Sequence, residues 1–226
     1  MFTVSERMPH ESAKDYVLRV LIDNIVNTRL EPGEKLPEPE LCEQLGVSRT
    51  PFREAELELA QRKLIEIRPK IGTYVSFIDA ELVEEVRHLR AVLESEIAAM
   101  ACTLLRPADI DRLWENVAVW QLYINRQQED KIFHLDKEFH KILYHLCHRD
   151  YWYELVENIA PHFDRTTILS FRCRPAGAIL HDHEQLIRAL ERRDETAARA
   201  IAAHHMDRYT ENIPAIRAAF PDYFKK

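Results

Sequence analysis

The chain has 226 residues, of which 46% are hydrophobic and 31% charged, and its formal net charge is −7 at pH 7. This length can bury a substantial core in one or two domains, and a glycine count of only four favours a mostly helical protein. No apolar run approaches the roughly 20 residues of a membrane helix, no signal peptide opens the chain, and the four cysteines form no CxxC pair. We therefore expect a cytoplasmic protein with reduced thiols and no membrane association.

A first helix is predicted over residues 11–29, and the stretch 36–76 then has the pattern of a winged helix-turn-helix. Leu41 and Leu45 lie at helical spacing, and Gly46 can adopt the left-handed backbone that ends a helix. Ser48 can cap a second helix, and Pro51 is tolerated in its first turn. Two short helices joined by a tight turn predict a helix-turn-helix, in which the start of the second helix enters the major groove.

Basic and hydroxyl side chains are concentrated where such a motif contacts DNA. Two short strands are predicted at 64–67 and 73–75, joined by a basic turn that forms the wing. Guanidinium groups suit guanine edges and phosphates, and hydroxyl groups suit phosphates. The residues that we expect to contact DNA are Ser48, Arg49, Thr50, Arg53, Arg68, Lys70 and Gly72.

The charge distribution indicates how DNA would be bound. Residues 1–78 contain 11 Lys and Arg against 13 Asp and Glu. Neither part of the chain is basic overall, so affinity must come from locally placed cations and should depend strongly on salt. A homodimer on an inverted-repeat operator would reinforce the contact made by one weakly charged half-site.

After the wing, six helices are predicted at about 80–105, 107–126, 130–148, 151–171, 175–192 and 195–212. The predicted fold class is therefore mostly α, with an N-terminal winged helix-turn-helix followed by an all-α six-helix bundle. We place the DNA-binding domain at 1–78 and an effector-binding and dimerisation domain at 79–226.

Four ionisable residues fall on the apolar faces of these bundle helices. Asp136 and His140 lie four apart on one helix face, and His183 and His205 each share a face with aliphatic residues. A single histidine on such a face is usually a satisfied core residue, but buried ionisable groups in this number need mutual partners or a metal. Three imidazoles and a carboxylate suit Zn²⁺, Ni²⁺, Mn²⁺ or Fe²⁺. His181 and His204 are nearby alternatives, but His183 keeps its helical spacing to Leu186 and Leu190, and His204 should face another way.

The run Gly46-Val47-Ser48-Arg49-Thr50-Pro51, followed by Arg53-Glu54-Ala55, closely resembles the winged helix of GntR-family bacterial transcription regulators. One departure is Glu56, where the family usually has an apolar residue. A buried carboxylate there would be costly, so we expect a slightly rotated helix or a Glu56 side chain that reaches solvent.

The second part resembles the FCD effector domain of the FadR-type branch, with the shorter VanR-type group as the better match. The resembling segments are Arg90 with Leu93-Glu94, Asp136 through His140, His183-Glu184 and 198–205. The resemblance implies that Asp136, His140, His183 and His205 hold a divalent ion and that a small organic acid completes its coordination. It also makes Arg90 a candidate for binding that effector, with a plain salt bridge to Glu94 one turn away as the alternative. Arg165, on the fourth bundle helix, is a weaker candidate.

The expected function is a ligand-responsive transcription regulator, a repressor rather than an enzyme. Two alternatives use the same residues. In a metal-ion sensor the ion itself is the signal, and in a metal-dependent hydrolase the ion would activate water. For a hydrolase, the sequence offers no evident acid or base, and the winged helix would have no role.

Overall fold

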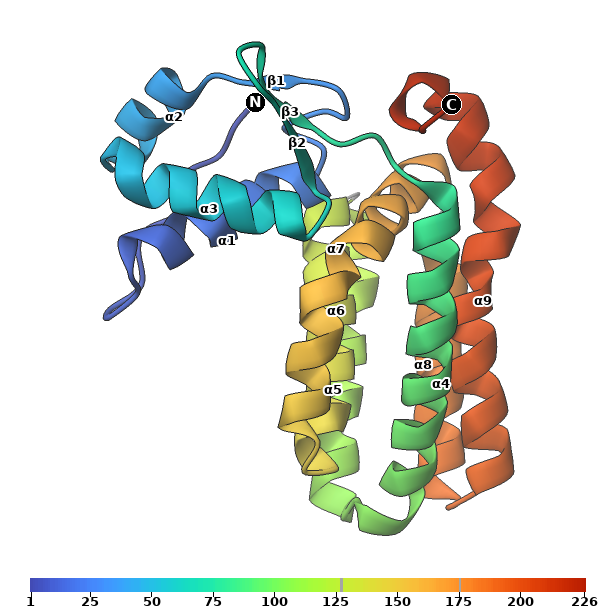
Figure 1. Cartoon of the computed structure of the whole chain (residues 1–226). Helices are drawn as coiled ribbons and strands as arrows, with labels where there is room; N and C mark the ends of the chain where they lie inside the picture. Colours follow the sequence, from blue (N-terminus) through green and yellow to red (C-terminus); the bar gives the residue numbers. More distant parts are fainter. Residues whose placement is uncertain (127, 175) are drawn as a thin grey trace. The chain divides into compact units, whose positions relative to one another are not determined.

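The computed structural model describes residues 1–126, 128–174 and 176–226, which form two compact units (Figure 1). One unit comprises Met1–Ala80 with Phe220–Lys226, and the other comprises Glu81–Ala219. Within the described ranges the first contains a winged helix-turn-helix and the second contains six helices, so the predicted fold class is confirmed.

The helix-turn-helix has the local features that the sequence predicts. Helix α1 (Ala13–Val26) precedes α2 (Glu38–Leu45) and α3 (Arg49–Gln61). Gly46 ends α2 in the left-handed conformation, with φ of 63°. Ser48 is the extended N-cap residue of α3, but its hydroxyl makes no capping hydrogen bond, which leaves that group available to a ligand.

The wing is a three-stranded antiparallel sheet. Its strands are β1 (Lys35–Leu36), β2 (Ile65–Arg68) and β3 (Gly72–Val75), in the order β1-β3-β2. The sequence predicts β2 and β3 but not β1. A two-residue strand has no periodicity to detect, and it exists because β3 offers it a partner edge.

The short C-terminal segment 220–226 belongs to the first unit, whereas the predicted boundary placed it in the second domain. Ile78 and Phe224 form a parallel β-bridge, and Lys225 pairs with Asp79 at 3.0 Å. The 3₁₀ helix η1 (Pro221–Tyr223) lies within this segment.

The second unit is a bundle of α4 (Ala80–Leu104), α5 (Pro107–Asn125), α6 (Glu129–Leu146), α7 (Asp150–Cys173), α8 (Gly177–Glu191) and α9 (Glu195–Ala219). Helix α5 packs on α6 and α8, and α7 packs on α6 and α9, so the long helices run side by side (Figure 1). Helix α9 extends past Pro214, seven residues beyond the predicted end at 212.

The bundle core contains charged and polar residues as well as apolar ones. Arg90, Glu94, Asp136, His140 and His183 are all buried. Charged residues are rarely buried without partners. The contacts of these residues therefore indicate where a functional site lies in the bundle.

Candidate metal centre and DNA-contacting surface

The start of α3 presents its predicted side chains to solvent. Ser48, Arg49, Thr50 and Arg53 are all exposed. Glu38 on α2 lies beside the two arginines: Arg53 Nε donates to its Oε1 at 3.2 Å, and Arg49 Nε is 3.9 Å away. These pairs are exposed and therefore weak, so both guanidiniums can turn to DNA at little cost.

The wing turn presents the remaining predicted residues. Arg68 and Lys70 are exposed, and the guanidinium of Arg68 lies 4.5 Å from the centre of the Tyr74 ring. Gly72 has φ of 144°, a conformation that other residues rarely adopt. The structure thus gathers these three residues in one turn and places the other four at one helix end.

Glu56 does not reach solvent, so this one of the two expected outcomes is wrong. It is buried with 6% of its surface exposed, and it is hydrogen-bonded to the side chain of Thr73 on β3. Burial raises the pKa of its carboxyl group, and the bond from Thr73 opposes that rise only in part. Glu56 therefore joins the recognition helix to the wing.

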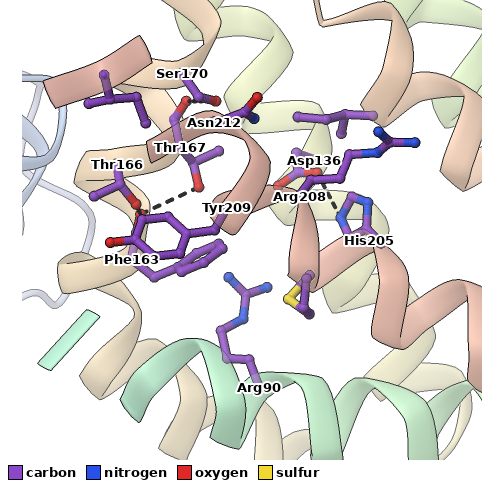
Figure 2. Close-up of a pocket in the computed structure, with 13 residues that line it drawn as sticks. Arg90, Asp136, Phe163, Thr166, Thr167, Ser170, His205, Arg208, Tyr209 and Asn212 are labelled. Carbon is purple, nitrogen blue, oxygen red and sulfur yellow. Dashed lines mark hydrogen bonds and ion pairs between the residues drawn. The ribbon is translucent and has the colours of Figure 1, made fainter. Parts of the chain in front are cut away.

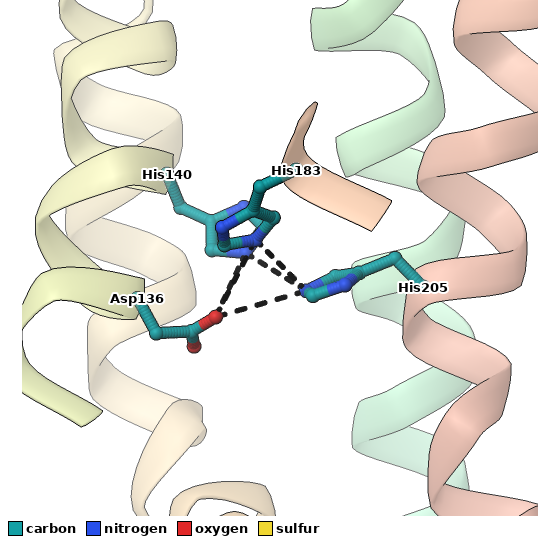
Figure 3. Close-up of side chains that lie close together, drawn as sticks. All are labelled: Asp136, His140, His183 and His205. Carbon is teal, nitrogen blue, oxygen red and sulfur yellow. Dashed lines mark hydrogen bonds and ion pairs between the residues drawn. The ribbon is translucent and has the colours of Figure 1, made fainter. Parts of the chain in front are cut away.

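Four predicted ligands converge inside the bundle (Figure 3). Asp136 and His140 come from α6, His183 from α8 and His205 from α9, and their ligand atoms all lie within 4.8 Å of one another. The Nε2 atoms of His140 and His183 are each 3.3 Å from Nε2 of His205. The spacing of four along α6 places its two ligands one helical turn apart on the same side.

The arrangement fits a cation by its chemistry. Asp136 Oδ1 is buried without a hydrogen-bond partner in the described part of the chain, and it lies 3.5 Å from His183 Nε2 and 3.8 Å from His205 Nε2. Lone pairs that converge on one point without donors repel one another, whereas a divalent ion satisfies all of them.

Carboxylates orient two of the imidazoles from behind. His140 Nδ1 lies 2.9 Å from Glu94 Oε2, which fixes the tautomer with its Nε2 lone pair directed at the cluster. His205 Nδ1 is 3.6 Å from Asp182 Oδ2, a looser version of the same arrangement. Such carboxylate–histidine pairs are typical supports of metal ligands.

The pKa values of His183 and His140 are shifted in opposite directions because their surroundings differ. Burial, reinforced by His205 and His140, lowers the pKa of His183 well below 6.5, so this ring is neutral and able to coordinate. Burial also lowers the pKa of His140, but the charge and hydrogen bond of Glu94 outweigh it and the net shift is upward. His183 is held by packing instead, stacked on Phe139 with ring centroids 4.1 Å apart.

A chain of alternating charges leads away from the cluster of Asp136 and the three histidines. Arg90 donates to Glu94 at 3.2 Å and faces Asp164 at 3.8 Å, and Asp164 accepts from Lys137 at 3.1 Å. Burial would raise the pKa of Glu94, but His140 and Arg90 lower it to about 2. The carboxylate is therefore ionised at every physiological pH.

A small cavity opens beside the cluster (Figure 2). Two ligands, Asp136 and His205, contribute to its wall, as do two arginines, Arg90 and Arg208. It encloses about 30 Å³, room for about two water molecules. A ligand larger than this would have to displace wall side chains.

The two candidate effector-binding residues, Arg90 and Arg165, differ in their position relative to the cavity. Arg90 lines the cavity, whereas Arg165 is buried and is not among the lining residues. Sequence reasoning missed Arg208, which lies three residues after His205 and so on the same side of α9. Asp182 accepts from Arg208 through both carboxylate oxygens. Burial would raise the pKa of Asp182, but Arg208 and His205 lower it to about 2.

Two family models match this chain. Residues 14–75 match the family model described as bacterial regulatory proteins, gntR family, and residues 85–208 match the FCD domain. The chain is 30% identical to the HTH-type transcriptional repressor RspR of Escherichia coli over 96% of both chains. It is 27% identical to the Nta operon transcriptional regulator of Aminobacter aminovorans over 89% of this chain and 95% of that one.

A solved structure supports the same fold. The structure of E. coli McbR/YncC superimposes with a TM-score of 0.79, at 24% identity, over 93% of this chain and 99% of that one. Among the described helices, none is both long and apolar enough to cross a membrane.

Proposed function

The chain belongs to the GntR family of bacterial transcription regulators and carries an FCD domain, and we propose that it is a repressor controlled by a small carboxylate bound at a divalent metal ion. It is a DNA-binding regulator and not an enzyme, because the members of its family are transcription regulators. The observation that carries the effector proposal is the cluster of Asp136, His140, His183 and His205, two of whose members, Asp136 and His205, line a cavity that Arg90 also lines.

Asp136 and the three histidines would hold the ion, which would supply open coordination positions for a carboxylate. Three imidazoles and one carboxylate form a borderline set that suits Zn²⁺, Ni²⁺, Mn²⁺ or Fe²⁺. Glu94 fixes the orientation of His140, and Arg90 offers a positive charge to an acid in the cavity.

DNA binding would rest on the exposed start of α3 and the wing turn. Arg49 and Arg53 are free to contact base edges or phosphates, and Arg68 and Lys70 to contact the backbone. Their number is small for a chain of net charge −7, which supports a homodimer that binds an inverted-repeat operator at two half-sites.

Regulation would follow from the size of the cavity. A cavity of about 30 Å³ cannot accept an organic acid unchanged, so the acid binds a rearranged bundle better than the ligand-free one. An effector with such differential affinity shifts the population of the two states, and operator affinity follows if those states bind DNA differently.

The test is thermal unfolding of the purified protein with a panel of small carboxylates, once loaded with metal and once stripped by chelation. A ligand that binds only the native state raises stability by mass action. We expect at least one acid to stabilise the loaded protein and not the stripped protein, and the same acid to release operator DNA. Stabilisation by metal alone, with operator release at buffered metal levels and no response to any acid, would instead establish a metal sensor.

A further inference from the structure

Glu38 places a carboxylate on the surface that we assign to DNA. It lies in the first turn of α2, beside the predicted DNA contacts Arg49 and Arg53 at the start of α3. A negative charge there repels phosphates and so lowers affinity for DNA of any sequence. What this carboxylate contributes to recognition must therefore come from its contacts with the two arginines.

Both arginines converge on one oxygen atom of Glu38. Arg53 Nε donates to Glu38 Oε1 at 3.2 Å, and Arg49 Nε lies 3.9 Å from the same atom. The two guanidiniums are four residues apart on one face of α3, where like charges repel each other, and the carboxylate offsets that repulsion. Only 24% of the Glu38 side chain is exposed, against 63% for Arg53, so the carboxylate has less freedom to move than the guanidinium that it holds.

The hydrogen bond to Glu38 uses only one edge of the Arg53 guanidinium. A guanidinium has five N–H donors in one plane, and the Nε–H is one of them. The four N–H groups on the two Nη atoms are left for another acceptor. Parallel donors of this kind match O6 and N7 of guanine in the major groove.

Holding Arg53 in this way favours contact with a base over contact with a phosphate. An unrestrained arginine has many rotamers, and the loss of that freedom on binding opposes association. A guanine contact in the groove also excludes water from the Glu38–Arg53 pair, which strengthens the attraction between the two charges. A loose contact with phosphate gains neither advantage and still meets the repulsion from the carboxylate, so Glu38 acts against nonspecific binding.

We propose that Glu38 is a specificity-determining residue for operator recognition, which positions Arg53 so that its Nη groups contact guanine. This rests on the proposed function, in which the start of α3 contacts DNA. Glu38 acts through Arg53 and does not itself contact a base. Its replacement by a neutral residue therefore raises affinity for nonspecific DNA and lowers the preference for the operator.

The test compares the full-length wild-type protein with Glu38→Gln on defined duplexes. The wild-type protein first selects its site from DNA with a randomised core of about 20 base pairs, two helical turns. Fluorescence anisotropy then gives the affinity for the selected duplex, for duplexes in which each G·C pair is replaced, and for a scrambled duplex. We expect Glu38→Gln to bind the scrambled duplex more tightly than the wild type, and to lose at least about threefold of the preference at one G·C pair in each half-site.

Glu40→Gln is the matched control, because Glu40 is exposed and lies in the same first turn of α2. It removes the same charge from the same helix end, where a carboxylate stabilises the helix dipole. The preference for every base pair should stay at the wild-type level. An equal loss of preference in Glu40→Gln would show that net charge or the stability of α2 is responsible, and it would overturn the proposal.

A double-mutant cycle shows whether Glu38 acts through Arg53. In an Arg53→Ala background, Glu38→Gln should cause no further loss of preference at the same base pair. A loss that persists there, or an unchanged preference in Glu38→Gln alone, overturns the proposal while leaving the DNA-contacting surface in place. If Arg49→Ala and Arg53→Ala both keep wild-type affinity and preference, the contact of α3 with DNA is refuted as well.

Discussion

Replacing Glu94 with glutamine should weaken metal binding while leaving all four ligands in place. Glu94 accepts from His140 Nδ1 at 2.9 Å and is itself bonded to Arg90 at 3.2 Å. Glutamine has the same shape but no charge, and its amide can turn an N–H towards His140, which would stabilise the wrong tautomer. Loss of a carboxylate behind a metal-bound histidine lowers affinity about 10- to 100-fold, which corresponds to about 1.4 to 2.8 kcal/mol.

The measurement is competition for Zn²⁺ against a chromophoric chelator at neutral pH. The matched control is Glu96→Gln, because Glu96 lies on the same helix but points outward and pairs with Arg199 at 2.6 Å. We expect the control to retain wild-type affinity. If both variants bind Zn²⁺ within threefold of the wild type, the carboxylate does not orient His140 and the proposed support of the metal site is wrong.

Three further predictions concern the DNA-binding unit. Arg49→Ala or Arg53→Ala should cost about 1–3 kcal/mol of operator binding if the side chain contacts a base. If it contacts a phosphate, the slope of log affinity against log salt concentration should fall by about one. Fluorescence anisotropy titrations over a salt series distinguish the two cases, and no effect of either variant would exclude the start of α3 as a DNA contact. Burial raises the pKa of Glu56, so ionisation destabilises the native state as pH rises from the unfolded to the folded pKa. Glu56→Gln should therefore be more stable than the wild type at pH 7, by about 1 kcal/mol, and equally stable below the unfolded pKa. For the exposed control, Glu54→Gln, the difference in stability from the wild type in urea denaturation should not change with pH. Gly72→Ala should destabilise the unit by about 1 kcal/mol or more, because φ at this position is 144°; unchanged stability in the same assay would contradict this.

The winged helix could be predicted in detail because its signals are local. Gly46 permits the left-handed backbone that ends α2, Ser48 is the N-cap of α3, and Gly72 permits the turn of the wing. Each of these effects depends on a few neighbouring residues only. The same holds for Asp136 and His140, since a spacing of four on a helix fixes their common direction. These features depend on backbone geometry that the sequence alone determines.

Other features depend on partners far apart in the sequence. The strand β1 forms only because β3 is available to it, and Glu56 can be buried only because Thr73 lies opposite. Arg165 is a candidate from the sequence but does not line the cavity, whereas Arg208 does. Which of two arginines faces a cavity depends on the rotation of each helix in the bundle, and apolar periodicity predicts that rotation only approximately.

The charged groups in the bundle core link the packing of the helices to the proposed metal ligands. Well-packed apolar residues would often be as stabilising as a buried ion pair or more so, whereas loss of one partner leaves an uncompensated charge. Lys137, Asp164, Arg90 and Glu94 form such a chain, and it ends at His140, a proposed metal ligand. An acid that binds next to Arg90 therefore acts on the same groups that orient this ligand. Any change it makes in metal affinity must be matched by an equal effect of the metal on acid affinity, so the two ligands are expected to be linked through residues that contact both.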